Sequence, residues 1–225
     1  PYIPFGKLLP ASAPTDKQEQ KLINAFNSTN PGGMTPAYVA LQGATKWGTD
    51  YSKTHKNEQQ VVVFVTDGYP NWCGTNHAAF AKVAGDAYNS FGVKTYAVGI
   101  VGASTSLLNK IASAGGTGSG IFIDNNNQIE QKLIAAMNKI KGDSVSCDFL
   151  LPANGQYDAE DATVIYTPSG GGSAITMARV ANQSKCGLGW YFDDPNNITK
   201  IHLCPGTCSM VQNDAGAAID ISFGC

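Results

Sequence analysis

Residues 61–65, VVVFV, are apolar at every position, and Thr66, Asp67 and Gly68 follow them directly. A run with no polar alternation is typical of a central strand that helices cover on both faces. The residue just beyond the carboxyl end of such a strand lies where open α/β sheets bind their ligands. The pattern therefore predicts a buried strand at 60–66 and makes Asp67 a candidate site residue.

Two further apolar runs predict strands at 93–101 and 120–125, and helical patterns surround all three strands. The helices are expected at 15–26, 37–52, 76–90, 106–116 and 128–141. Strands that alternate with helices of this length form βαβ units and a parallel sheet. We expect the three strands to be parallel neighbours in chain order, joined by right-handed crossovers. Residues 2–10 are apolar and flanked by proline, which favours an edge strand or an extended arm.

The pattern changes near Gly142. Short β-type runs, separated by turns rich in Gly or Asn, occur at 147–152, 162–168, 174–180, 189–194, 200–204 and 217–225. We therefore predict an α/β domain over residues 1–142, with a doubly wound, mostly parallel sheet. A small antiparallel β module is predicted over residues 143–225. A module of this size is expected to need disulfides for stability.

The chain has six cysteines, Cys73, Cys147, Cys186, Cys204, Cys208 and Cys225. An even number, with five in the β module, predicts that all six pair and that the protein occupies an oxidising compartment. Loop length gives one preference among the possible pairings: Cys204 and Cys208 should pair with distant partners rather than with each other. The alternative is a zinc site formed by these two residues and His202, but their spacing is poor for a zinc ribbon.

Composition narrows the possible partners. The formal net charge is −2 and charged residues make up 14% of the chain, so no basic surface for nucleic acid is expected. No apolar run approaches the roughly 20 residues that cross a membrane, and no signal peptide is visible. Together with the cysteines, this favours a secreted, periplasmic or cell-surface protein in a mature or cut form.

Thr35 and Asp67 are the candidate metal ligands. Thr35 lies in the tight loop GGMTP at a helix start, and Asp67 follows the buried strand. A hydroxyl and a carboxylate at the carboxyl edge of one sheet are hard oxygen ligands of the kind that Mg²⁺ prefers. The alternative is structural, with Thr35 capping its helix and Asp67 capping a turn. Asp193 and Asp194 could bind Ca²⁺, but adjacent carboxylates in one strand point to opposite faces, which favours a solvated turn.

Five segments, taken in order and spacing, resemble the von Willebrand factor type A domain. They are PGGMTPAYVAL (31–41), VVVFVTDGYP (61–70), VKTYAVGIV (93–101), LNKIASAGGT (108–117) and GIFIDNNNQIEQKL (120–133). The resemblance implies a doubly wound sheet with a metal-ion-dependent adhesion site at its top. By position, Thr35 matches the metal-site threonine of the family and Asp67 its second metal-site aspartate. The resemblance also implies a binding module rather than an enzyme, with Mg²⁺, or else Mn²⁺ or Ca²⁺, capturing a carboxylate of a protein ligand.

The chain departs from the family in one respect. The first metal motif of the family, Asp-x-Ser-x-Ser at the end of its first strand, is not found in these 225 residues. That strand would lie next to 60–66, and a sheet without it would leave backbone groups unpaired. We therefore expect an incomplete metal site and a separate segment or chain that supplies the strand. The β module, with CGLGWYFDDP and LCPGTC, resembles cysteine-containing extensions in some exported bacterial members of the family.

Three functions remain open at this point. The first is an extracellular binding protein that adheres to a protein ligand or assembles a surface structure. The second is a structural subunit with a vestigial metal site, which the missing motif favours. The third is a Mg²⁺-dependent hydrolase or phosphotransferase with Asp67 as metal ligand or nucleophile. Against the third, no acidic residue stands two positions after Asp67 and no lysine follows in VTDGYP.

Overall fold

The computed structural model describes residues 3, 4, 6, 8, 16–30, 32–55, 58–124, 128–151, 158–169, 172–214 and 216–224. They belong to two compact units, Pro1–Thr35 and Pro36–Cys225. In the first unit, helix α1 (Lys17–Ser28) begins where the Asp16 carboxylate accepts hydrogen bonds from the backbone N–H groups of Gln18 and Glu19. No residue of α1 is buried. The predicted arm at 2–10 lies largely outside the described residues.

In the second unit, three strands form a parallel sheet. They are β1 (Val61–Thr66), β2 (Lys94–Ile100) and β3 (Ile121–Ile123), in the order β1-β2-β3. Val63 of β1 lies opposite Tyr96 of β2, and Val98 of β2 lies opposite Ile121 of β3. The predicted strand order and direction are confirmed.

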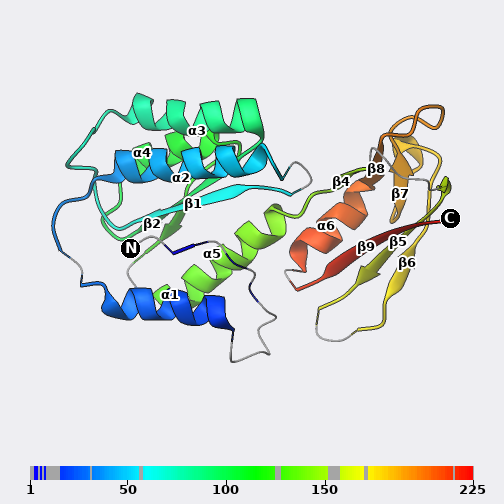
Figure 1. The fold of residues 1–225 in the computed structure, drawn as a ribbon, viewed down its shortest axis with the longest axis horizontal. Helices are drawn as coiled ribbons and strands as arrows, with labels where there is room; N and C mark the ends of the chain where they lie inside the picture. The colour runs from blue at the N-terminus through cyan, green and yellow to red at the C-terminus, as the bar shows by residue number, and fades with distance from the viewer. Residues whose placement is uncertain are drawn as a thin grey trace. The chain divides into compact units, whose positions relative to one another are not determined.

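Helices cover both faces of this sheet (Figure 1). They are α2 (Ala37–Ser52), α3 (His77–Phe91), α4 (Thr105–Ala114) and α5 (Ile129–Asp143). Side chains alternate along a strand, so Val62 and Phe64 pack in the core with α2, α3 and α4, whereas Val61 and Val63 pack on the side of α5. Two separate layers of apolar contacts therefore hold the strands in place.

The β module contains two antiparallel sheets. The first sheet has the order β4-β8-β7 and consists of β4 (Asp148–Leu150), β8 (Lys200–Leu203) and β7 (Trp190–Phe192). The second has the order β6-β5-β9 and consists of β6 (Ile175–Met177), β5 (Asp158–Thr167) and β9 (Ala218–Gly224). Val164, Trp190 and Ile201 are almost completely buried in a core that is distinct from those of the parallel sheet. The predicted fold class, an α/β sheet followed by small antiparallel sheets, is confirmed.

Helix α6 (Pro205–Asn213) is a correction, because the sequence predicted β-type runs alone in this module. Pro205 stands in the first turn, where a missing N–H costs little and a fixed φ favours the helix. Thr207 and Val211 are the buried residues of this helix. The segment is short and has few apolar positions, so a helical repeat cannot be recognised in its sequence.

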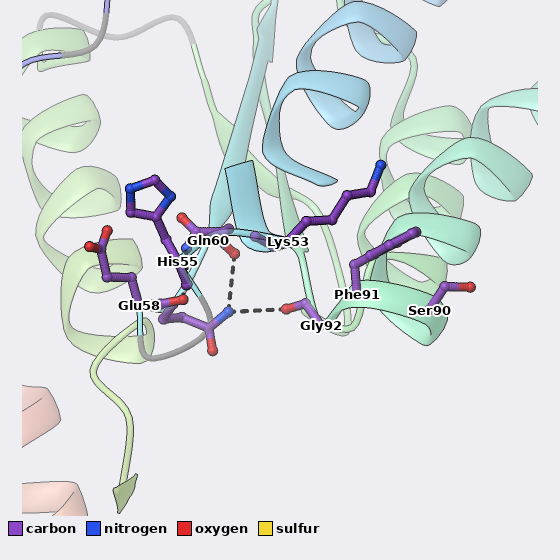
Figure 2. Close-up of a pocket in the computed structure, with 9 residues that line it drawn as sticks. Lys53, His55, Glu58, Gln60, Ser90, Phe91 and Gly92 are labelled. Atoms are coloured by element: carbon purple, nitrogen blue, oxygen red, sulfur yellow. Dashed lines mark hydrogen bonds between the residues drawn. The ribbon is translucent and has the colours of Figure 1, made fainter. Parts of the chain in front are cut away.

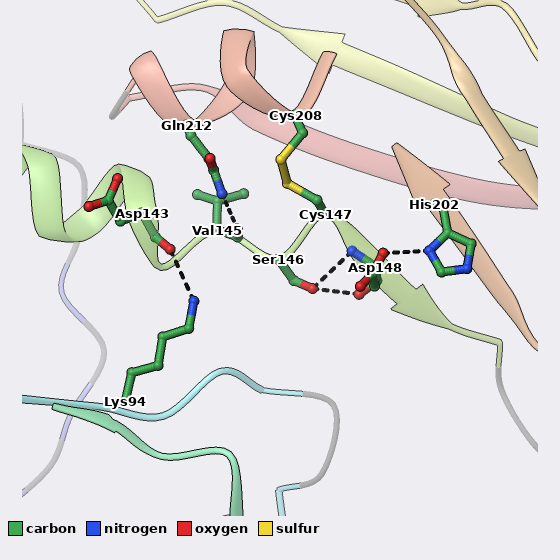
Figure 3. Close-up of a disulfide and its surroundings, with 9 residues drawn as sticks. All are labelled: Lys94, Asp143, Val145, Ser146, Cys147, Asp148, His202, Cys208 and Gln212. Carbon is green, nitrogen blue, oxygen red and sulfur yellow. Dashed lines mark hydrogen bonds and ion pairs between the residues drawn. A yellow bond between two sulfur atoms is a disulfide. The ribbon is translucent and has the colours of Figure 1, made fainter. Parts of the chain in front are cut away.

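Two disulfides lie within the β module. They join Cys147 to Cys208, as Figure 3 shows, and Cys186 to Cys204. The prediction that Cys204 and Cys208 pair with distant partners is confirmed, and a zinc site at these two residues is ruled out because both sulfurs are already bonded. Cys73 is exposed and carries a free thiol, which differs from the prediction that all six cysteines pair. Cys225 lies outside the described residues.

The end of α5 is joined tightly to α6. Gly142 of α5 is buried, and a Cβ atom at this position would lie 1.8 Å from the carbonyl oxygen of Gln212. The Gln212 side-chain amide donates a hydrogen bond to the carbonyl oxygen of Val145 at 3.2 Å (Figure 3). Lys94 on β2 also contacts the end of α5, where its Nζ donates a hydrogen bond to the carbonyl oxygen of Asp143 at 3.5 Å. Two helix backbones approach this closely only where a glycine leaves the space.

Candidate functional site

Asp67 stands immediately after β1, at the carboxyl edge of the parallel sheet. Its side chain is exposed, and its carboxylate has no hydrogen bond or ion pair among the residues that the structure describes. The turn that follows β1 is held by Thr66 instead, whose hydroxyl oxygen accepts a hydrogen bond from the N–H of Gly68 at 3.3 Å. The alternative in which Asp67 caps this turn therefore finds no support in the described contacts.

The backbone at Asp67 is fixed by the loop that follows β2. Gly102 has a φ of 99°, and a Cβ atom there would lie 2.6 Å from the carbonyl oxygen of Asp67. A side chain at position 102 would be strained and would push the two loops apart. The sequence analysis did not identify Gly102, because the loops meet only when the strands are paired. Its contact places the carboxyl ends of β1 and β2 directly beside one another.

Thr35 is half-buried and is the last residue of the first unit. Helix α2 begins after Pro36 and has no side-chain hydrogen bond at its N-cap. Capping of α2 by Thr35, the structural alternative, stays a hypothesis beside the metal role. The two units are defined separately, so the sharing of one ion by Thr35 and Asp67 stays a prediction.

Large apolar side chains stand close to Asp67 in the chain and were not identified from the sequence. Tyr69 is 66% exposed and Trp72 is 58% exposed, and both belong to the loop between β1 and α3. The loop packs closely against α2 at Gly74, where a Cβ atom would lie 3.2 Å from the ring of Tyr38. Exposed aromatic residues on an ordered loop are typical of surfaces that bind other proteins. The sequence signal was the pair of aromatics within GYPNWCG.

Other metal-site candidates are not supported. Across the described ranges, no three His, Cys, Asp or Glu side chains lie close enough together to hold a metal ion. Asp193 accepts hydrogen bonds from the N–H groups of Thr199 and Lys200, both at 3.0 Å, and from the Thr199 hydroxyl. Desolvation raises the pKa of Asp193, but these hydrogen bonds outweigh it and hold the pKa well below its usual range. Asp193 therefore holds a turn, as the sequence favoured.

The chain matches one known family. The sequence profile of the von Willebrand factor type A domain matches residues 10–135, which include Thr35, Asp67 and the whole parallel sheet. No curated protein matches the chain. Within the described part of the chain, no helix is long and apolar enough to cross a membrane.

Proposed function

Because the chain belongs to the von Willebrand factor type A domain family, whose members generally mediate adhesion or protein interaction, we propose that it is an extracellular, metal-assisted binding protein. The observation that carries the proposal is the exposed Asp67 carboxylate at the end of β1, which has no partner among the described residues. A carboxylate that no described residue engages, held at the edge where α/β sheets bind ligands, is available to an external ligand.

The ion proposed for this site is Mg²⁺, with Mn²⁺ or Ca²⁺ as substitutes. Asp67 and Thr35 would each contribute one side-chain oxygen, and such oxygens are the hard ligands that these ions prefer. When bound, the ion would supply a positive centre that captures a carboxylate of a protein ligand. Two protein ligands are too few for near-octahedral Mg²⁺, so the affinity of this chain alone should be weak.

We propose that a further strand pairs with β1 and completes the site. The exposed edge of β1 supports this partner. In the described sheet β1 is an edge strand, and Val65, on the same face as the buried Val98, is 43% exposed. A strand carrying an Asp-x-Ser-x-Ser motif, from the same polypeptide or from another chain, would cover apolar surface and add metal ligands together.

The metal site is tested by Asp67→Ala. The parent protein, purified from its source with whatever segment accompanies it, is titrated with Mn²⁺ and the bound ion is followed by electron paramagnetic resonance. We expect the affinity of the variant for Mn²⁺ to fall at least about tenfold. The reason is that loss of a charged ligand should cost more than about 1.4 kcal/mol of binding free energy, which corresponds to a factor of ten. Asp220→Ala, which removes an exposed carboxylate from β9, is the control and should bind as the parent does. Unchanged Mn²⁺ binding in Asp67→Ala would favour the structural-subunit alternative.

The added strand is tested by hydrogen exchange. In residues 1–225 alone, we expect the amides of β1 that point away from β2 to exchange quickly, because no described strand pairs with them. In the source protein the same amides should be protected, and its mass under native conditions will show whether the strand belongs to the same polypeptide or to a second one. Slow exchange of all β1 amides in residues 1–225 alone would contradict the proposal.

An extracellular or periplasmic location is part of the proposal. The two disulfides support it, since such bonds form and persist in oxidising compartments. Domains of this family are typically interaction modules rather than enzymes, which is why we place the function in binding and not in hydrolysis or phosphoryl transfer.

A further inference from the structure

A second candidate site lies at the amino end of the sheet, at the opposite end of β1 from Asp67. It is a pocket of about 610 Å³ between the end of α2, the start of β1 and the end of α3 (Figure 2). This volume falls within the range of pockets that bind small molecules. No feature of the proposed metal site accounts for it.

The base of the pocket is fixed by the side-chain amides of two glutamines. Gln59 Nε2 donates hydrogen bonds to the carbonyl oxygens of Gln60, at 3.0 Å, and Gly92, at 3.1 Å. Gln60 Nε2 donates to the carbonyl oxygen of Glu58 at 2.7 Å. These bonds connect the start of β1 to the end of α3, so the pocket is formed before any ligand arrives. Both Oε1 atoms have no donor among the described residues and remain available as acceptors.

The two sides of the pocket carry opposite charges. Glu58 and His55 lie on one side (Figure 2). The Glu58 carboxylate accepts a hydrogen bond from the Tyr51 hydroxyl at 3.3 Å. Lys53 and Phe91 lie on the other side, with Lys53 Nζ 5.6 Å from the centre of the Phe91 ring. The Lys53 ammonium also pairs with Asp50 at 2.7 Å, outside the pocket. Among the described lining residues, an anionic ligand would meet the Glu58 carboxylate and a cationic ligand the Lys53 ammonium.

Neutral hydroxyl groups suit this lining best. A hydroxyl both donates and accepts hydrogen bonds, so it can donate to the Glu58 carboxylate and to the glutamine Oε1 atoms and accept from Lys53. The exposed Phe91 ring offers an apolar surface for the C–H groups of a sugar ring. We propose that this pocket binds a neutral saccharide of one or two rings. The proposal is independent of the metal site.

Binding is tested with the ¹⁵N-labelled chain in EDTA, titrated with maltose, cellobiose, lactose and diacetylchitobiose. We expect at least one of these sugars to cause saturable chemical-shift changes at Gly92 and at the side-chain amides of Gln59 and Gln60, with a millimolar Kd. EDTA removes divalent ions, so the result does not depend on the metal proposal. Absence of saturable changes with all four sugars would overturn the proposal.

Two variants test the roles of the lining. Glu58→Gln and Phe91→Ala should each weaken the binding about tenfold, because one removes a charged acceptor and the other the apolar surface. Glu130→Gln and Ile134→Ala, both on α5 and outside the pocket, are the matched controls and should bind as the parent does. Binding that is equal in all four variants would contradict the site. Larger shifts at the same amides with free lysine or glutamate than with the sugars would contradict the ligand class.

Discussion

At the scale of single residues, the aspartates of this chain differ in how fully they are bonded. Asp50 pairs with Lys46 and Lys53, whose hydrogen bonds lower its pKa to about 2. Asp124 pairs with Lys132, which likewise lowers the pKa of its carboxyl group. Asp67 has no comparable contact among the described residues. Its carboxylate is therefore available to an ion from solution.

Asp214 should make the stability of the β module sensitive to acid. The Ser169 side chain, the Ser169 N–H at 2.9 Å and the Tyr166 hydroxyl at 2.8 Å donate hydrogen bonds to its carboxylate, and these lower its pKa from 3.8 to about 2. A carboxyl group whose pKa is lower in the folded state contributes stability above about pH 4, and this is lost as the pH falls towards 2. Asp214→Asn should therefore lower the melting temperature by a few degrees at pH 6, with the difference shrinking below pH 4.

The measurement is thermal unfolding by circular dichroism across this pH range. Asp220→Asn, on the neighbouring β9, is the control for a change of net charge alone. A difference between Asp214→Asn and the parent that is the same at pH 6 and pH 2 would show that the lowered pKa contributes nothing to stability.

At the scale of elements, sequence pattern predicted what depends on local periodicity. The helix expected at 37–52 is found as Ala37–Ser52, because its apolar positions recur with helical spacing and Pro36 precedes it. Helix α6 was missed, since its nine residues bury two side chains and its start is marked by a proline alone. Asp67 was predicted as a site residue because it ends an apolar run, and its role stays a prediction. The pocket was missed because it depends on contacts such as Gln59 to Gly92, which are 33 residues apart.

The contact between α5 and α6 should tolerate no side chain at Gly142. Gly142→Ala would place a methyl group against the Gln212 carbonyl, so we expect the free energy of unfolding to fall by about 1–3 kcal/mol. Gly43 on α2 is a matched control, because it is also helical but has no atom within 4 Å of its Cβ position. Gly43→Ala should raise the free energy of unfolding by about 0.5–1 kcal/mol. Urea denaturation measures both, and a stabilised Gly142→Ala would mean that the two helices are free to separate.

At the scale of the whole molecule, each disulfide constrains a different length of chain. Cys147–Cys208 closes a separation of 61 residues and Cys186–Cys204 one of 18 residues. In the loop-entropy description, their removal costs about 4 and about 3 kcal/mol respectively. Replacing both cysteines of the longer loop with serine should therefore destabilise the β module more than the same change in the shorter loop. Calorimetry on the two double variants gives the order, and the reverse order would contradict it.

The three tryptophans make the β module distinguishable by fluorescence from α2 and the loop after Asp67. Trp190 is buried in the core of the β module, Trp72 is exposed on the loop after Asp67, and Trp47 is exposed on α2. An indole in water emits at longer wavelength than one in an apolar core, so the blue part of the emission reports on the β module and the red part on the other two. A variant that keeps Trp72 alone would follow events beside Asp67, and one that keeps Trp190 alone would follow unfolding of the module.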